Sequence, residues 1–203
     1  MAENALTRRR FMAVSAAALG GLALFGCSNK AKRQESGTDA SENEEGKILV
    51  ACFSATGNTR AVATTLAAHL GADYFEIEPS ELYTAEDLDY GDETTRATAE
   101  QHDASSRPSI ASVPDFSAYD VVLLGHPIWW GLAPRIMYTL LESADVSGKK
   151  VAEFCTSGSS GVESAAAELK GLASDADWVG AHRFAAGAPE SEIADWADSL
   201  NLR

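Results

Sequence analysis

The sequence predicts an α/β domain with a five-stranded parallel sheet and helices on both faces. Short apolar runs alternate with segments whose apolar residues recur every three or four positions, a pattern typical of strands and amphipathic helices in turn. Such alternation favours parallel strands joined by helical crossovers. The run VVLLG at 121–125 is apolar throughout, as expected of a strand that is covered on both faces.

The expected elements follow in chain order. The strands are ILVACF at 48–53, DYFEIE at 73–78, VVLLG at 121–125, VAEFC at 151–155 and DWVGAHRF at 177–184. The second run alternates between polar and apolar residues, which indicates a strand nearer the sheet edge. The helices carry four apolar stripes: Val62, Leu66 and Leu70; Ile136, Met137, Leu140 and Leu141; Val162, Ala166, Leu169 and Ala173; and Ile193, Trp196 and Leu200. Residues 80–118 are acidic, and we expect one helix near 92–104 with surface loop around it.

Residues 1–27 are expected to be a signal peptide and not part of this domain. A basic group, TRRRF at 7–11, precedes an Ala-rich apolar run that ends at Phe25. This run is shorter than the roughly 20 residues that span a bilayer as a helix, and a short apolar run after a basic group is the anatomy of an export signal.

Two finer patterns in the leader suggest an export route and an anchor. Arg8-Arg9 before Phe11 resembles a twin-arginine export signal. LFGC at 24–27 resembles a bacterial lipobox, which implies lipidation of Cys27; the alternative is an ordinary signal peptide with an incidental cysteine. The polar residues 28–46 are expected to be a disordered tether and residues 47–203 the folded domain. The protein is therefore expected to be exported and lipid-anchored to the outer face of the cytoplasmic membrane.

Composition narrows the class of partner. The formal net charge is −14, which argues against nucleic acid, because phosphate binding requires clustered Lys and Arg. The acidic residues at 81–92 are either a solvated surface or a docking patch for a basic redox partner. Cys52 and Cys155 are expected to be buried thiols, and the sequence has neither CxxC spacing nor a Cys/His cluster, so no metal site is expected.

Three loops contain the candidate ligand-binding residues, because such sheets bind ligands beyond the carboxyl ends of their strands. The first loop consists of Ser54, Ala55, Thr56, Gly57, Asn58 and Thr59. Hydroxyls and free amides at a helix N-terminus form an anion site, although a plain helix cap with spare hydroxyls explains the same residues. One glycine without Gly-Lys-Ser matches neither G-x-G-x-x-G nor a P-loop.

The other two loops favour a planar aromatic ligand. The second loop contains Pro127, Ile128, Trp129, Trp130 and Gly131, and the third contributes Thr156, Ser157, Gly158 and Gly161. Adjacent tryptophans beside glycine and proline in a loop are hard to explain as core residues, whereas a flat ligand explains them.

Two ionisable residues border these loops. His126, at the end of the third strand, is interpreted as a packing residue, with a proton relay as the alternative. Arg60, in the first helical turn, is expected to face solvent, with contact to a phosphate as the alternative.

Together the three loops resemble those of flavodoxins. SATGNT matches their S-x-T-G-N-T phosphate loop, and PIWWG and FCTSGSSG resemble the second and third flavin-binding loops of a bacterial flavodoxin-like subfamily, over about residues 47–200. The resemblance implies strand order 2-1-3-4-5 and FMN as cofactor. The first loop would hold the phosphate, the second would border the isoalloxazine with Trp130 as the stacking ring, and the third would approach its other side. In that order Cys52 and Cys155 lie about 10 Å apart, too far for a disulfide.

The third loop departs from the flavodoxin pattern, because it lacks the tyrosine that many flavodoxins place there as the outer stacking ring. One flavin face would then be open, and three functions compete. The first is an FMN-binding electron-transfer protein that serves redox partner proteins, some of them membrane-bound. The second is an FMN-dependent NAD(P)H:quinone-type reductase, which an open face favours. The third is a binding module without flavin, against which the intact phosphate and tryptophan loops argue.

Overall fold

The computed structural model describes residues 46–202. The predicted leader with Cys27, and all of the predicted tether except Gly46, lie outside the described residues. Within residues 46–202, no helix is both long enough and apolar enough to cross a bilayer.

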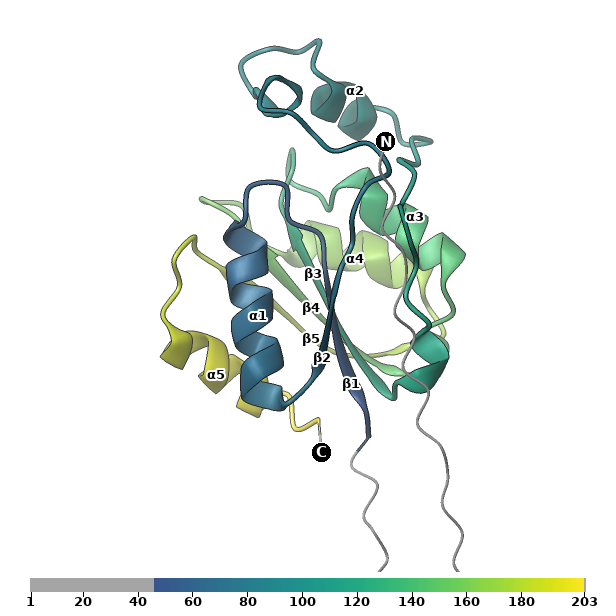
Figure 1. Cartoon of the computed structure of the whole chain (residues 1–203), viewed down its shortest axis with the longest axis vertical. Helices are drawn as coiled ribbons and strands as arrows, with labels where there is room; N and C mark the ends of the chain where they lie inside the picture. The colour runs from purple at the N-terminus through teal and green to yellow at the C-terminus, as the bar shows by residue number, and fades with distance from the viewer. Residues whose placement is uncertain (1–45, 203) are drawn as a thin grey trace, which may run out of the picture. The chain divides into compact units, whose positions relative to one another are not determined.

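Five parallel strands form one sheet in the order β2-β1-β3-β4-β5 (Figure 1). The strands are β1 (Ile48–Cys52), β2 (Asp73–Glu76), β3 (Val121–Pro127), β4 (Lys150–Thr156) and β5 (Asp177–Phe184). The predicted fold class and strand order are therefore confirmed. The short β2 is an edge strand with exposed residues, as its alternating sequence predicts, whereas β1 is buried throughout.

Helices cover both faces of the sheet (Figure 1). They are α1 (Asn58–Leu70), α2 (Arg96–His102), α3 (Arg135–Ser143), α4 (Glu163–Leu172) and α5 (Glu190–Ser199). One core lies between the sheet and helices α1 and α5, and the other lies between the sheet and helices α3 and α4. All four predicted apolar stripes fall largely on these helices, because their buried residues recur at the helical period.

The segment between β2 and β3, residues 77–120, lies largely beyond the carboxyl end of the sheet (Figure 1); we call it the β2–β3 excursion. The two chain segments at its base are joined by an antiparallel bridge between Pro79 and Ile110. A hydrogen bond of 2.8 Å from Ser80 N to Ser109 O joins them as well. The excursion contains the 3-10 turns Glu86–Leu88 and Phe116–Ala118 as well as α2, so the helix expected near 92–104 is confirmed over a shorter span.

Helix α2 is attached to the start of α3. The Gln101 amide Nε2 donates to Ala133 O at 3.0 Å, and Arg135 Nη2 donates back to Gln101 O at 3.1 Å. Both side chains are buried. The prediction that this segment is surface loop around one helix is therefore wrong in part, because buried polar contacts of this kind have no periodic signal in the sequence.

Cys52 and Cys155 are free, buried thiols, as predicted. Burial raises the pKa of Cys155 to about 12, with the nearby Glu153 carboxylate adding to the rise. Burial likewise raises the pKa of Cys52. Both therefore stay protonated and unreactive at neutral pH.

Candidate functional site

A hollow of about 250 Å³ lies at the carboxyl edge of the sheet, where the three predicted loops meet. From the first loop it is lined by Ala55, Thr56 and Asn58, from the second by Pro127, Ile128 and Trp129, and from the third by Thr156, Ser157 and Gly158. Leu88, Tyr90 and Ala186 complete the lining. The structure therefore brings nine of the predicted residues to one site, and places Ser54, Gly57, Thr59, Trp130, Gly131 and Gly161 outside its lining.

The first loop enters α1 without a side-chain cap. Gly57 is the N-cap residue, with a left-handed backbone at φ 91°, a conformation that glycine adopts readily. Ser54 Oγ accepts a hydrogen bond of 3.1 Å from Gly57 N and so fixes the turn before the helix. No side chain caps α1, so its first backbone amides are free to bind an anion, and whether the loop is an anion site or a plain helix cap with spare hydroxyls stays open.

Thr59 lies deeper than the sequence suggests. Its side chain is 1% exposed, and its hydroxyl lies 2.7 Å from that of Thr156 at the end of β4. This contact ties the first turn of α1 to the start of the third loop. A direct hydrogen bond from Thr59 to a phosphate stays a prediction.

Trp129 is a core residue, which corrects the expectation that neither tryptophan is core. Its ring is 3% exposed and makes edge contacts with Phe53, at 5.6 Å between centroids, and with Tyr83, at 5.2 Å. Paired hydrogen bonds between the backbones of Trp129 and Leu132, at 2.9 and 3.0 Å, fold the second loop back on itself. Tyr83, from the β2–β3 excursion, covers one side of the Trp129 ring. The sequence pattern does not predict this contact.

Trp130 occupies the tip of this fold-back. Its φ is 47° and that of Gly131 is 82°, consecutive positive values as in a type I′ turn. A positive φ is rare for so bulky a residue. The partly exposed Trp130 ring packs on Tyr90, with centroids 4.7 Å apart and planes tilted by 42°, and contacts His102. Its predicted stacking on a flavin stays a prediction.

Arg183, on β5, holds the third loop in place. Its Nη2 donates to Ser157 O at 2.7 Å and to Gly158 O at 2.9 Å, and its Nε donates to Ser157 Oγ at 3.2 Å. The loop backbone beside the hollow is thereby fixed by a cation. Arg183 is not among the predicted site residues, because a single arginine on an edge strand belongs to no sequence motif.

His126 and Glu153 form a buried pair directly beneath the second loop. Both side chains are 0% exposed, and His126 Nε2 lies 2.9 Å from Glu153 Oε1. His126 Nδ1 lies 2.9 Å from the Pro127 carbonyl, which can only accept, so Nδ1 carries a proton. A second proton must lie between Nε2 and Oε1, since two facing lone pairs would repel. The full burial of His126 is compatible with its interpretation as a packing residue, and the alternative of a proton relay stays a prediction.

Arg60 is bound by a carboxylate on β2. Its Nε lies 2.8 and 2.9 Å from the two oxygens of Glu76, and its Nη2 also contacts Oε1. Half of the Arg60 side chain is exposed, as expected for a residue facing solvent. The pairing leaves Arg60 outside the lining of the hollow.

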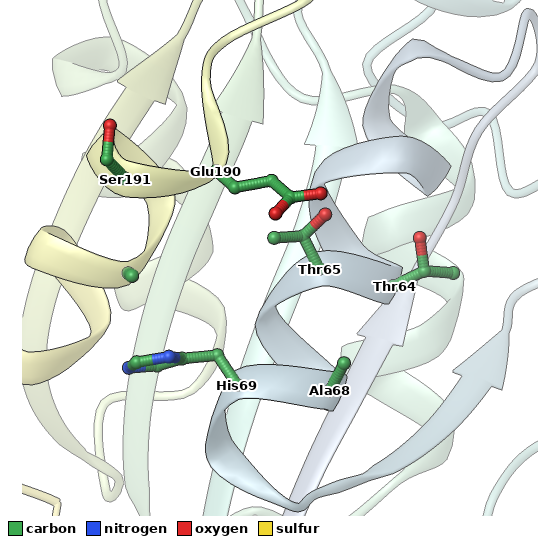
Figure 2. A pocket seen from close by; sticks show the side chains of 7 residues that line it. Thr64, Thr65, Ala68, His69, Glu190 and Ser191 are labelled. Carbon is green, nitrogen blue, oxygen red and sulfur yellow. The ribbon is translucent and has the colours of Figure 1, made fainter.

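A larger hollow, of about 570 Å³, lies between α1 and α5 (Figure 2). It is lined by Thr64, Thr65, Ala68, His69, Glu190, Ser191 and Ala194. None of these is a predicted site residue, and none comes from a strand end. The chemistry expected of this fold therefore belongs to the smaller hollow at the switch point between β1 and β3.

The fold and the site define a protein of the flavodoxin class. The flavodoxin family model matches residues 47–200, and the chain belongs to the flavodoxin family. It is similar to a candidate flavoprotein from Bacteroides eggerthii, with 40% identity and a TM-score of 0.73 over 78% of this chain and 99% of the other. A second, from Bacteroides uniformis, has 40% identity and a TM-score of 0.73 over 76% and 99%.

A flavoprotein from Lactobacillus acidophilus, solved in complex with FMN, shares the fold. Its identity is 23% and its TM-score 0.59, over 75% of this chain and 99% of the other. None of the curated proteins matches the chain.

Proposed function

We propose that the chain is an FMN-binding electron-transfer flavoprotein. The observation that carries the proposal is the convergence of the three predicted loops on one hollow at the switch point of a parallel sheet, where ligands of this fold class bind. Bound FMN would supply one- and two-electron chemistry. The chain would bind and orient it, exclude water from one side and tune its potential.

The residues of the site fit FMN. The uncapped first turn of α1, with Thr56 and Asn58 on the hollow, suits a terminal phosphate. Ile128 and Trp129 offer an apolar wall, and the backbone of Ser157 and Gly158 offers polar contacts for a ring edge. The hollow is slightly smaller than the range of about 300–1000 Å³ that is usual for ligand sites, so a bound flavin would leave part of itself outside or displace a wall residue.

We further propose that the protein works outside the cytoplasmic membrane. The leader pattern with Arg8-Arg9 and Cys27 supports export and lipid anchoring, and the polar residues 28–46 would let the domain reach redox partners at the membrane. The acidic surface would favour basic partner proteins.

Purification of the full chain carrying Cys27→Ser, which blocks lipidation, tests the cofactor. We expect a yellow protein whose flavin, released by denaturation, has the mass of FMN. FAD as the main species, or a colourless protein that takes up no FMN, would overturn the proposal.

The absence of an aromatic residue from the third loop favours one alternative, an FMN-dependent NAD(P)H:quinone-type reductase. Steady oxidation of NADPH by the FMN-loaded protein in the presence of a quinone would establish it. An electron-transfer protein is expected to show no such turnover without a partner protein.

A further inference from the structure

Tyr90 is the one aromatic residue of the hollow's lining that comes from outside the three loops. The other aromatic lining residue, Trp129, is fixed by its edge contacts with Phe53 and Tyr83. Tyr90 is 59% exposed, and the ring contact recorded for it is the one with Trp130, at 4.7 Å. Tyr90 therefore has the freedom to reorient that Trp129 lacks.

The backbone that carries Tyr90 is held close to the hollow. Asp92 N donates to Asp89 O at 3.3 Å, and Gly91 N donates to Asp89 Oδ1 at 2.8 Å, so Tyr90 lies at the tip of a tight turn. Helix α2 begins a few residues later, and its Thr98 hydroxyl donates to Asp92 O, at the end of the turn, at 3.2 Å. The exposed ring of Tyr90 is therefore carried by a backbone that hydrogen bonds hold in place.

A large exposed ring beside an aromatic partner gains contact area if a planar ligand enters. Offset stacking between aromatic systems is favourable beyond the area it buries. The third loop provides no aromatic side chain, and Leu88, the neighbouring lining residue of the excursion, offers no π-surface. Tyr90 is thus placed to cover a ring system that the third loop leaves uncovered.

We propose, on the basis of the FMN site above, that Tyr90 is the outer aromatic residue of that site and exchanges its contact with Trp130 for contact with the flavin ring. The β2–β3 excursion would then supply the outer aromatic ring that the third loop supplies in flavodoxins with a tyrosine there. The flavin becomes enclosed by a segment that is far from the three loops in sequence.

Titration of FMN into flavin-free protein tests the proposal. Tyr90→Ala is expected to weaken FMN binding about 2- to 12-fold, the effect of one lost stacking contact. Tyr90→Phe keeps the ring and should bind within about twofold of the wild type. Leu82→Ala is the matched control, because Leu82 is 70% exposed in the same excursion but does not line this hollow, and it should leave the affinity unchanged.

Nuclear Overhauser effects in the FMN complex give a second readout that does not depend on a change in affinity. We expect cross-peaks between the flavin ring protons and the ring protons of Tyr90, assigned by their loss in Tyr90→Phe with selective tyrosine labelling. If the wild type binds FMN but Tyr90→Ala binds equally well, or Tyr90→Phe weakens binding as much as Tyr90→Ala, this inference fails and the proposed function stands. Failure of the wild type to bind FMN overturns both.

Discussion

Trp129 and Trp130 are neighbours in the sequence, yet their rings meet different surroundings. Trp129 packs between Phe53 and Tyr83 in the core, and Trp130 packs on the exposed Tyr90. The residue pattern predicts correctly that the second loop borders a site, but it cannot assign the two rings. That assignment depends on Tyr83 and Tyr90, which come from a distant segment without periodic pattern.

The two tryptophans should therefore respond differently to truncation. Trp129→Ala is expected to lower the free energy of unfolding by about 3–5 kcal/mol, because it empties a buried site. Trp130→Ala should cost much less stability, because the Trp130 ring is partly exposed. If Trp130 is the stacking ring, as the sequence predicts, the variant should also brighten the fluorescence of bound FMN. Urea denaturation and flavin fluorescence measure the two effects. Equal loss of stability, or brightening by Trp129→Ala alone, would show that the rings are wrongly assigned.

At the scale of elements, the strands and the flanking helices were predictable, whereas only the one helix of the β2–β3 excursion was. Alternation of apolar runs with helical stripes defines β1 to β5 because burial imposes a period on each element. The excursion follows no period, because its inward residues, such as Tyr83, Leu88 and Gln101, are irregularly spaced and contact segments that are distant in the sequence. It nevertheless contributes to the core and to the lining of the hollow.

Strand β4 also carries a residue that its apolar pattern does not explain, Glu153. Glu153→Ala would leave the buried His126 Nε2 without its hydrogen-bond partner, and the free energy of unfolding should fall by about 1–3 kcal/mol. The double variant His126→Leu with Glu153→Leu should recover most of that loss, because a buried pair is replaced by apolar side chains. Urea denaturation of the single and double variants checks this, and a single variant as stable as the wild type would contradict it.

At the scale of the whole molecule, one turn recurs on the acidic surface. Asp92, Asp103, Asp115 and Asp145 each accept hydrogen bonds from the Ser or Thr two residues later. Hydrogen bonds from the side chain and then from the backbone of that residue hold the pKa of each carboxyl below its usual range. The Asp-x-Ser/Thr spacing is visible in the sequence, whereas its effect on titration requires the turn geometry.

These carboxyls should make the domain sensitive to acid. Because their pKa is lower when folded than when unfolded, their stabilising effect is complete above about pH 4, the unfolded value, and is lost as pH falls through the folded values. The urea midpoint should therefore drop as the pH falls below about 4. Asp115→Asn with Asp145→Asn should show a shallower drop than the wild type, and an equal drop would mean that other groups dominate.

The proposed export signal and the proposed FMN site raise one common question, which is when the cofactor is loaded. FMN is held without a covalent bond and is made inside the cell, whereas a chain threaded unfolded across the membrane would have to find it outside. A twin-arginine route carries folded protein, so the first loop could be filled before export. Replacing Arg8-Arg9 with Lys-Lys should then abolish flavin-loaded protein at the outer membrane face in fractionated cells, while the cytoplasmic pool retains flavin. Undiminished flavin-loaded protein outside would show that export does not depend on the arginine pair. The argument that FMN is inserted before export would then fail.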